Sequence, residues 1–247
     1  MLVLEKLSKN FGGVQAVKEL DLRVNKGAIL GLIGPNGSGK STTVNLVCGI
    51  FPASGGRVVF ESRDITNAPT HQRVDHGIAR TFQNIRLFNQ LTVWQNLWVA
   101  RSQTQNGGGR SILTQFFGGA RKAKEQMESL IEFSGLGHKI GELAGNLAFG
   151  EQRRLELARA LATDPKLLLL DEPAAGMNME EIGELKERLL KIRDQGKTIL
   201  LVEHVMELVM GVTEHIVVLD FGQKIAEGSP AEIQQNPLVR KAYLGSE

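Results

Sequence analysis

The sequence predicts an α/β protein with a helical subdomain inserted into its core. Strand-like apolar runs, accompanied by helix patterns, occur in both terminal parts of the chain, as in a sheet covered by helices. Between them, residues 84–163 change to helical periodicity. We therefore expect one domain, residues 1–247, in which 1–83 and 164–247 form the α/β core and 84–163 form the helical subdomain.

The first part of the core predicts an antiparallel β portion that leads into a strand and a helix. Strand-length apolar runs near the N-terminus are separated by turn-forming residues. The expected strands are residues 2–7, 18–24, 28–34, 56–60 and 77–83, and the expected helix is 40–49.

The second part of the core predicts buried strands separated by helices. Residues 166–173 and 197–204 contain near-continuous apolar runs, as in strands that are buried on both faces. Residues 179–196 have the pattern of an amphipathic helix that ends on a glycine. The last expected strands are 214–220 and 223–228, on either side of a turn at Phe221–Gly222.

Composition and charge describe a globular protein with no strong electrostatic preference. Charged residues make up 23% of the chain, and the formal net charge of +2 is too small to indicate nucleic-acid binding. The single cysteine, Cys48, excludes an intrachain disulfide. The N-terminus has no signal-peptide pattern, and no apolar run approaches the roughly 20 residues of a membrane helix. We expect any work at a membrane to depend on a partner.

Residues 34–42, GPNGSGKST, match the pattern G-x-x-x-x-G-K-[ST] of a phosphate-binding loop. Glycines let backbone N–H groups converge on an anion, the lysine reaches the terminal phosphates, and the hydroxyl can bind Mg²⁺. A chance glycine-rich turn is the alternative, and the strand before the motif and the helix after it argue against that. The expected nucleotide-binding residues are Gly34, Pro35, Asn36, Gly37, Ser38, Gly39, Lys40, Ser41 and Thr42.

Two carboxylates follow the apolar run of residues 167–170. Asp171 can hold Mg²⁺ through water, and Glu172 can polarise a water for attack on a γ-phosphate. An Asp-Glu pair alone is usually structural, but together with a phosphate loop it predicts a catalytic site. Gln83 and His204 also stand at expected strand ends. Their spacing leaves open either an ordinary polar role or a contact with Mg²⁺ or the attacking water.

Residues 147–161, LAFGEQRRLELARAL, predict a helix that begins at Gly150. Ala148 and Phe149 precede it and provide no hydroxyl to cap it. The first N–H groups of such a helix are unpaired and carry the positive end of its dipole, so they favour an anion. An ordinary amphipathic helix is the alternative on this pattern alone.

Taken in order, these motifs resemble the ATP-binding cassette of ABC transporters. Six motifs follow one another in the order found in that family: the phosphate loop, Gln83, residues 147–161, the run LLLLDEP, the sequence AAGMN and His204. The resemblance covers essentially the whole chain and implies a P-loop NTPase core of the ABC type, with ATP and Mg²⁺ as cofactors. It also implies two cassettes that sandwich two ATP molecules head to tail, so that the phosphate loop of one faces the signature helix of the other.

The resemblance implies a role for individual residues. Phe11 would stack on adenine with Val17 beside it, although an apolar residue before a turn is the alternative for Phe11. Glu172 would be the general base, with Lys40 and His204 as the other catalytic residues. The implied metal ligands are Ser41, Gln83 and Asp171. The implied signature residues at the partner's ATP are Ala148, Phe149, Gly150 and Glu151, and residues 175–178 would couple the two sites.

The chain departs from the family pattern at two positions. The signature usually reads Leu-Ser-Gly-Gly-Gln, so Ala148 lacks a hydroxyl that would reach the partner's γ-phosphate. A hydrogen bond to a charged group contributes about 1.5–3 kcal/mol, so we expect the ATP sandwich to be weaker but retained. Asn178 stands where the coupling loop usually ends in aspartate.

Three segments resemble the branched-chain amino acid uptake group, and within it the cassette with the longer insert. They are the variant signature, the sequence LDEPAAGMN and the C-terminal sequence VRKAYLG. This implies a second cassette, two integral-membrane permease subunits and a periplasmic or surface binding protein as partners, and no nucleic acid. It also implies a place on the cytoplasmic face of a bacterial or archaeal inner membrane. Uptake systems for urea or amides share many of these sequence motifs and stay an alternative.

Other functional classes fit the sequence less well. Soluble ABC ATPases of translation or DNA repair usually carry two cassettes in one chain or a long coiled coil. A nucleotide kinase would need an arginine-rich lid, and an ATP-binding module without turnover would lack Glu172. Two aromatic pairs stay open: Trp94 and Trp98 either line a permease groove or pack the subdomain, and Phe116 and Phe117 either touch a partner or anchor a loop.

Overall fold

The computed structural model describes residues 1–105 and 120–244, which divide into two compact units. The first unit consists of Met1–Arg80 together with the chain from Leu167 onward, and the second is Thr81–Lys166. We expected the divisions at 83 and 163. Phe116 and Phe117, whose roles the sequence left open, lie outside the described residues.

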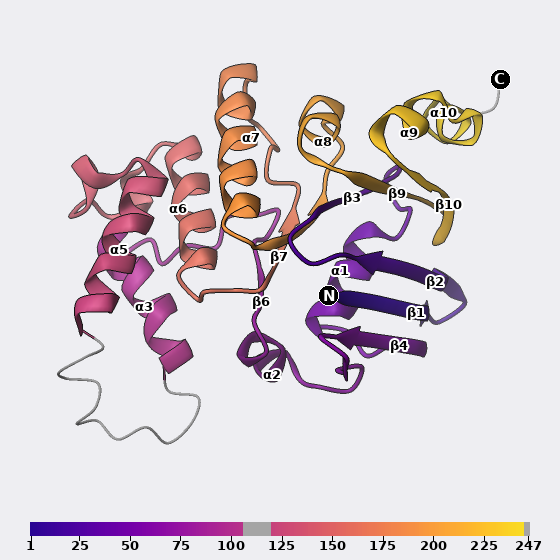
Figure 1. Ribbon diagram of the computed structural model, residues 1–247, viewed down its shortest axis with the longest axis horizontal. Helices are drawn as coiled ribbons and strands as arrows, with labels where there is room; N and C mark the ends of the chain where they lie inside the picture. The colour runs from indigo at the N-terminus through magenta and orange to yellow at the C-terminus, as the bar shows by residue number, and fades with distance from the viewer. Residues whose placement is uncertain (106–119, 245–247) are drawn as a thin grey trace. The chain divides into compact units, whose positions relative to one another are not determined.

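Two sheets form the framework of the first unit (Figure 1). An antiparallel sheet has the order β2-β1-β4-β5, and a second sheet has the order β10-β9-β3-β8-β7-β6. The strands are β1 (Leu2–Phe11), β2 (Val14–Val24), β3 (Ile29–Ile33), β4 (Gly55–Phe60), β5 (Arg63–Asp64), β6 (Ile78–Arg80), β7 (Leu167–Asp171), β8 (Thr198–Val202), β9 (His215–Asp220) and β10 (Gln223–Gly228). This agrees with the expected α/β class and its antiparallel N-terminal portion.

The six-stranded sheet brings three chain segments to one edge. Strands β3, β7 and β8 run parallel, with Ile29 opposite Ile199 and Leu169 opposite Leu200. Parallel strands place their carboxyl ends on the same side of a sheet, so the segments that follow these three strands meet there. They are the phosphate loop, residues 172–178 and residues 203–205.

The two faces of this sheet are buried by different layers. On one face, apolar side chains such as Leu32 and Val217 share a core with helix α1 (Lys40–Cys48) and the antiparallel sheet. On the other face, Ile33 and Val218 pack with residues of the helices that follow β8 and β10. Burial on both faces explains why β3, β7 and β8 are almost entirely apolar.

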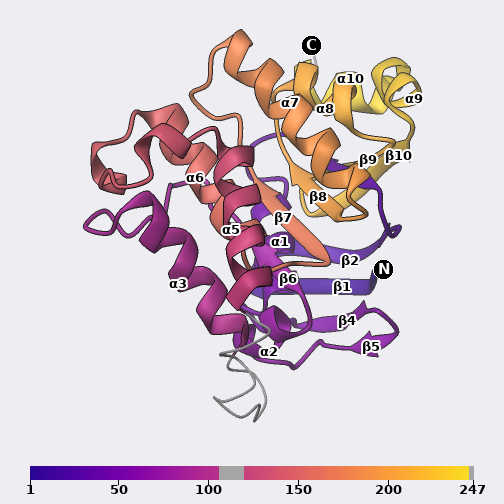
Figure 2. The ribbon, with the colours of Figure 1, turned by 60° about the vertical axis from the view of Figure 1, so that its left-hand side comes forward.

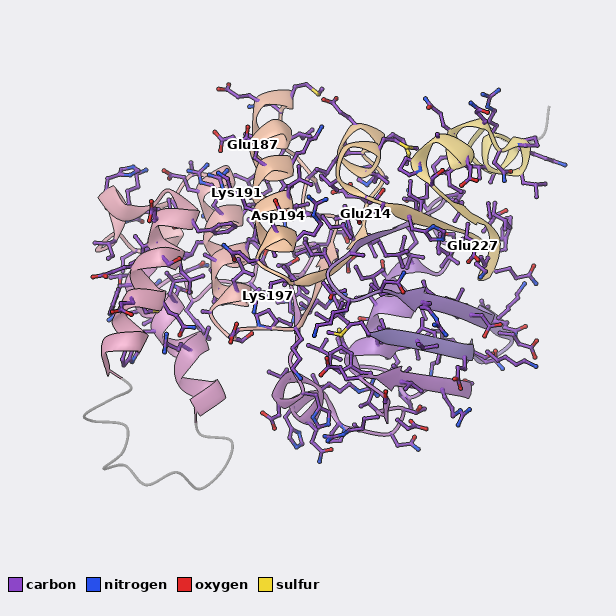
Figure 3. The ribbon with its side chains drawn as sticks, viewed as in Figure 1. Glu187, Lys191, Asp194, Lys197, Glu214 and Glu227 are labelled. Carbon is purple, nitrogen blue, oxygen red and sulfur yellow. The ribbon has the colours of Figure 1, made fainter. Side chains whose placement is uncertain are left out.

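The helices of the first unit follow the periodicity of the sequence. Helix α7 buries Ile182, Leu185 and Leu189 and exposes Glu187 and Lys191 on its opposite side, as the labels in Figure 3 show. The helices are α1 (Lys40–Cys48), α2 (Thr70–Asp75), α7 (Met179–Asp194), α8 (Met206–Val212), α9 (Pro230–Gln235) and α10 (Pro237–Leu244).

The second unit is helical and has its own core. Its helices are α3 (Val93–Gln105), α5 (Ala120–Ser134) and α6 (Phe149–Leu161), with short 3-10 turns at Gly137–Lys139 and Ala144–Asn146. Both α3 and α5 pack on α6 (Figure 2) through a cluster that includes Leu97, Met127 and Leu155. Among residues 1–105 and 120–244, no helix is both long and apolar enough to cross a bilayer.

Candidate nucleotide-binding and hydrolysis site

The loop between β3 and α1 has a conformation that only glycine permits at two positions. A Cβ on Gly34 would lie 2.1 Å from the Leu219 carbonyl oxygen, and one on Gly39 would lie 2.5 Å from that of Ala16. Both residues also have positive φ angles, 149° and 104°. The backbone of residues 34–39 is therefore held against two neighbouring strands, in the compact form that an anion-binding loop needs.

Lys40 places its ammonium group inside this loop. Its Nζ donates hydrogen bonds to the carbonyl oxygens of Gly34 (2.7 Å) and Pro35 (2.9 Å). Burial lowers the pKa of Lys40, and the negative charges of Glu172 and Asp171 partly oppose this. The lysine is thus electrostatically coupled to both carboxylates that the sequence predicted for the site.

Helix α1 begins without a side-chain cap. Gly39 is its N-cap and no side chain accepts a hydrogen bond there, while Thr43 turns its hydroxyl back to the Gly39 carbonyl oxygen (2.9 Å). The free N–H groups and the dipole of the helix favour a phosphate at this end. Ser41 lies exposed in the first turn, where its hydroxyl is available to a ligand.

Asp171 ends β7 in a buried ion pair with Arg80, which ends β6. Arg80 Nη2 donates to Asp171 Oδ2 at 2.7 Å, and the two side chains are 10% and 6% exposed. Arg80 was not predicted from the sequence. The signal for it was a charged residue at the end of a short apolar strand, which needs a partner because an isolated buried charge is costly.

Glu172 has a left-handed backbone, with φ at 50°. This conformation is uncommon for a residue other than glycine and is often found at functional positions. Its N–H donates to the carbonyl oxygen of Val202 at 2.8 Å, which fixes the turn away from β7. His204 Nδ1 lies 3.9 Å from Glu172 Oε1, so the predicted base and the predicted histidine lie together.

Two predicted strand ends were placed too late. Strand β8 ends at Val202, because the Glu203 carboxylate accepts the N–H groups of His204 and Val205 and removes them from the ladder. Strand β6 ends at Arg80, and Gln83 follows in an irregular segment of the second unit.

Phe11 and Val17 lie at the antiparallel sheet. Phe11 is 43% exposed and meets Phe51 edge-on, with 5.3 Å between ring centroids. Val17 is fully buried in the core, and a Cβ on Gly39 would lie 3.6 Å from its Cγ2. Lys9 Nζ lies 4.9 Å from the centroid of the Phe11 ring, so stacking of an adenine on Phe11 stays a prediction, whereas Val17 lies beside the phosphate loop.

The segment around Gln83 is tied to helix α6 within the second unit. Arg153 donates from Nη1 to the Phe82 carbonyl oxygen (3.1 Å) and from Nη2 to that of Gln83 (2.7 Å). Glu156 accepts the Arg86 N–H at 3.2 Å. Arg153 and Glu156 were not predicted as functional. The contacts lie some 70 positions apart in sequence, which no local pattern reveals.

Helix α6 begins at Phe149, one residue before the expected Gly150, and Ala148 is its N-cap without a side-chain cap. Phe149 is 49% exposed, and the guanidinium of Arg153 lies 5.3 Å from its ring centroid. Glu151 accepts the N–H of Ala148 at 3.0 Å and pairs with Lys139 at 2.8 Å. No side chain caps this helix start, and the binding of an anion there stays a prediction from the sequence.

Asn178 has a clear structural role as the N-cap of α7. Its Oδ1 accepts the Glu181 N–H at 3.0 Å, and Glu181 accepts the Asn178 N–H at 2.9 Å. This reciprocal pair is a capping box, in which asparagine and aspartate are about equally favourable N-caps. The departure from aspartate is therefore compatible with the local fold.

The two tryptophans differ in how far they are buried in the second unit. Trp94 packs against the core of the second unit and Trp98 is half exposed. Their rings stack with centroids 6.2 Å apart and an interplanar angle of 16°. Trp94 therefore anchors the ring that Trp98 presents to solvent.

The donor set suits a magnesium ion bound together with a nucleotide. Mg²⁺ prefers oxygen ligands and usually takes only one or two from the protein. Ser41 and Asp171 supply a hydroxyl and a carboxylate near the phosphate loop in the first unit, whereas Gln83 belongs to the second. The described residues contain no cluster of three or more histidines, cysteines or carboxylates that would hold a metal alone.

Comparison with known proteins decides the family. The family model described as ABC transporter matches residues 17–175, which is more than half of the chain. The chain belongs to the ABC transporter ATP-binding family. A second family model, described as branched-chain amino acid ATP-binding cassette transporter, matches residues 223–247.

Individual members of the ABC family align over nearly the full length. The high-affinity branched-chain amino acid transport ATP-binding protein BraF of Pseudomonas aeruginosa is 40% identical, over 99% of this chain and 98% of its own. The corresponding LivG protein of Salmonella typhimurium is 41% identical with the same coverage. A crystal structure of the ADP conformation of an ABC transporter cassette has a TM-score of 0.85 and 34% identity, over 100% of this chain and 99% of that one. The chain is therefore an ABC cassette ATPase that binds ATP.

Proposed function

We propose that this chain is the ATP-hydrolysing subunit of an ABC importer for branched-chain amino acids: leucine, isoleucine and valine. The observation that carries the hydrolytic role is the convergence of Lys40, Asp171, Glu172 and His204 at one edge of the six-stranded sheet. The cargo is supported by the printed functions of BraF and LivG and by the C-terminal family match.

In the proposed reaction, the amides of the phosphate loop and the ammonium of Lys40 hold the phosphates. Glu172 takes a proton from the water that attacks the γ-phosphate, and His204 contacts that phosphate.

Ser41, Asp171 and Gln83 would hold Mg²⁺, which neutralises phosphate charge when bound. Phe11 would stack on the adenine, with Val17 behind the loop.

A second cassette would complete the site. We propose that Ala148, Phe149, Gly150 and Glu151 of each subunit face the ATP of its partner, where the N-terminus of α6 offers backbone N–H groups and a favourable dipole. Residues 175–178 would couple the two sites. The partner is either a second copy or a different cassette.

The remaining partners follow from the importer role. We propose two integral-membrane permease subunits and, through them, a periplasmic or surface binding protein, with this chain on the cytoplasmic face of a bacterial or archaeal membrane. The second unit would meet the permease, and the ring of Trp98 is a contact that it offers there.

The hydrolytic role is tested by Glu172→Gln in the assembled transporter. Removal of a general base lowers a rate by about 10²–10⁴-fold, and ATP binding should persist because the phosphate loop is unchanged. Glu187→Gln, exposed on α7, is the matched control and should keep full activity. Undiminished hydrolysis by the Glu172 variant would remove the catalytic assignment.

The cargo is tested by identifying the membrane proteins that co-purify with the chain. ATPase activity in vesicles is then measured with leucine, isoleucine, valine, urea and short amides in turn, each with its binding protein. Stimulation by urea or amides alone would replace the branched-chain proposal with a related uptake system. Absence of any integral-membrane partner would instead indicate a non-transport ABC ATPase.

A further inference from the structure

Glu203 is a fully buried carboxylate that the proposed mechanism does not use. It follows β8 directly, and it is 0% exposed. A buried charge without compensation is strongly unfavourable, so its surroundings must supply hydrogen bonds. The surroundings are two loops of the site.

Each oxygen of Glu203 binds a different loop. Oε1 accepts the N–H of Ala174 at 2.7 Å, two residues after Glu172. Oε2 accepts the N–H groups of His204 at 2.8 Å and Val205 at 3.1 Å. Three donors to one carboxylate are a strong, charge-assisted set, and they link the turn after β7 to the turn after β8.

The linked turns contain the two residues whose placement hydrolysis needs. Glu172 has a left-handed backbone, which persists only where the surroundings hold it. The bond from its N–H to Val202 holds one side of this turn, and the Glu203 bond to Ala174 holds the other. The imidazole of His204 also lies between two carboxylates, with Nδ1 3.9 Å from Glu172 Oε1 and 3.8 Å from Glu203 Oε2.

We propose that Glu203 is a positioning residue that holds the backbones of Glu172 and His204 in their working arrangement. The inference rests on the proposed roles of these two residues. A side chain with one acceptor cannot replace Glu203, because both of its oxygens are used. In Glu203→Gln, the amide nitrogen would face either Ala174 or the His204–Val205 pair, donor against donor, and one loop would be released.

The test measures steady-state ATP hydrolysis by the assembled transporter carrying Glu203→Gln. We expect kcat to fall about tenfold to a hundredfold, the range for loss of one hydrogen bond to a charged group, with KM for ATP changed by less than about threefold. Thr198→Val is the matched control. Thr198 is fully buried at the start of β8, the strand that Glu203 follows, and accepts one N–H, from Gly27 at 2.9 Å. Its loss should therefore lower the melting temperature without changing kcat.

A double-mutant cycle separates positioning from a general loss of stability. If Glu203 acts through Glu172, Glu203→Gln should lower the residual hydrolysis of Glu172→Gln by much less than it lowers that of the wild type. Effects that simply multiply would overturn the proposal. Full hydrolysis by Glu172→Gln alone would overturn the base assignment instead, so the two failures are distinguishable.

Amide hydrogen exchange measures how firmly the two turns are held, independently of ATP hydrolysis. Residues 172–178 and 203–206 should both exchange faster in Glu203→Gln than in the wild type, and neither should change in Thr198→Val. Unchanged exchange in residues 172–178 would overturn the link. If Glu203→Gln does not fold, Glu203→Asp keeps the charge but shortens the reach, and it should show the same fall in kcat to a smaller extent. Full kcat in Glu203→Asp together with wild-type exchange in both segments would overturn the proposal.

Discussion

Arg80 joins the helix of the phosphate loop to the strand that carries Asp171. Its guanidinium lies 2.7 Å from Asp171 Oδ2 on β7, and it donates to Asn45 Oδ1 on α1 at 2.6 Å. One side chain therefore holds the phosphate-binding and metal-binding elements of the site in register.

We predict that Arg80→Met destabilises the chain by about 3–5 kcal/mol, because it leaves the Asp171 carboxylate buried without its cation. The free energy of unfolding in guanidinium chloride measures this. Arg57→Met is the control, since Arg57 pairs with Glu5 on the surface and such pairs contribute about 0–1 kcal/mol. Equal losses in the two variants would contradict the importance of the buried pair.

Ala148→Ser restores the hydroxyl that the signature lacks. If the start of α6 meets the partner's ATP, one added hydrogen bond to a charged phosphate should tighten the ATP-dependent cassette dimer by about tenfold or more. Sedimentation with ATP in the Glu172→Gln background measures the dimer. Ala148→Gly changes the same N-cap without adding a hydroxyl, and it should not tighten the dimer. An unchanged dimer affinity in the serine variant would make the missing hydroxyl irrelevant.

Substitutions at Asn178 separate its capping role from its position in the coupling loop. Asn178→Ala should lower the free energy of unfolding by about 1 kcal/mol, because Glu181 loses its acceptor. Asn178→Asp keeps the cap and adds a negative charge at the start of α7, so stability should stay equal or rise slightly. Denaturant titrations of both variants check this. An alanine variant as stable as the wild type would show that the capping box contributes nothing.

Glu151 predicts a pH dependence in the second unit. The hydrogen bond from Lys139, with that from the Ala148 N–H, holds the pKa of Glu151 below its ordinary value of 4.5. A carboxylate whose pKa is lower in the folded state stabilises the fold above its unfolded pKa, and this contribution is lost as pH falls through the folded pKa. The stability advantage of the wild type over Glu151→Gln should therefore be present at pH 7 and shrink below about pH 4.5.

Urea titrations between pH 7 and pH 3 measure this difference. Glu187→Gln is the control, because Glu187 is exposed on α7, as is the neighbouring Lys191 that Figure 3 also labels. An advantage over Glu151→Gln that stays constant across the range would show that the Lys139 pair does not act through the charge of Glu151.

Local patterns were sufficient for the framework and for the phosphate loop. Gly34 and Gly39 are recognisable because the loop needs their conformations, and β3, β7 and β8 are recognisable because burial on both faces makes them apolar. The turn at Phe221–Gly222 lies where the sequence predicted it, between β9 and β10. In each case the determining interaction lies within or beside the segment itself.

The contacts that organise the site were not visible in the sequence. Arg80 and Asp171 are 91 positions apart, and Ala174 and Glu203 are 29 apart, so their pairing depends on how the strands are ordered in the sheet. The same long-range contacts explain the misplaced strand end at His204, because a side chain takes the N–H groups that would have extended β8. The residues expected to contact ATP were recognisable from local motifs, whereas the residues that hold them in place were not.

Cys48 has a practical value for spectroscopy. Burial raises the pKa of its thiol to about 11, so the thiol is protonated near neutral pH and reacts poorly with maleimides or spin labels. A cysteine introduced on the surface of either unit would be labelled selectively, with no need to remove the natural one. Paired probes, one on α7 and one on α3, would then report the distance between the two units in each nucleotide state, directly in the otherwise unmodified protein.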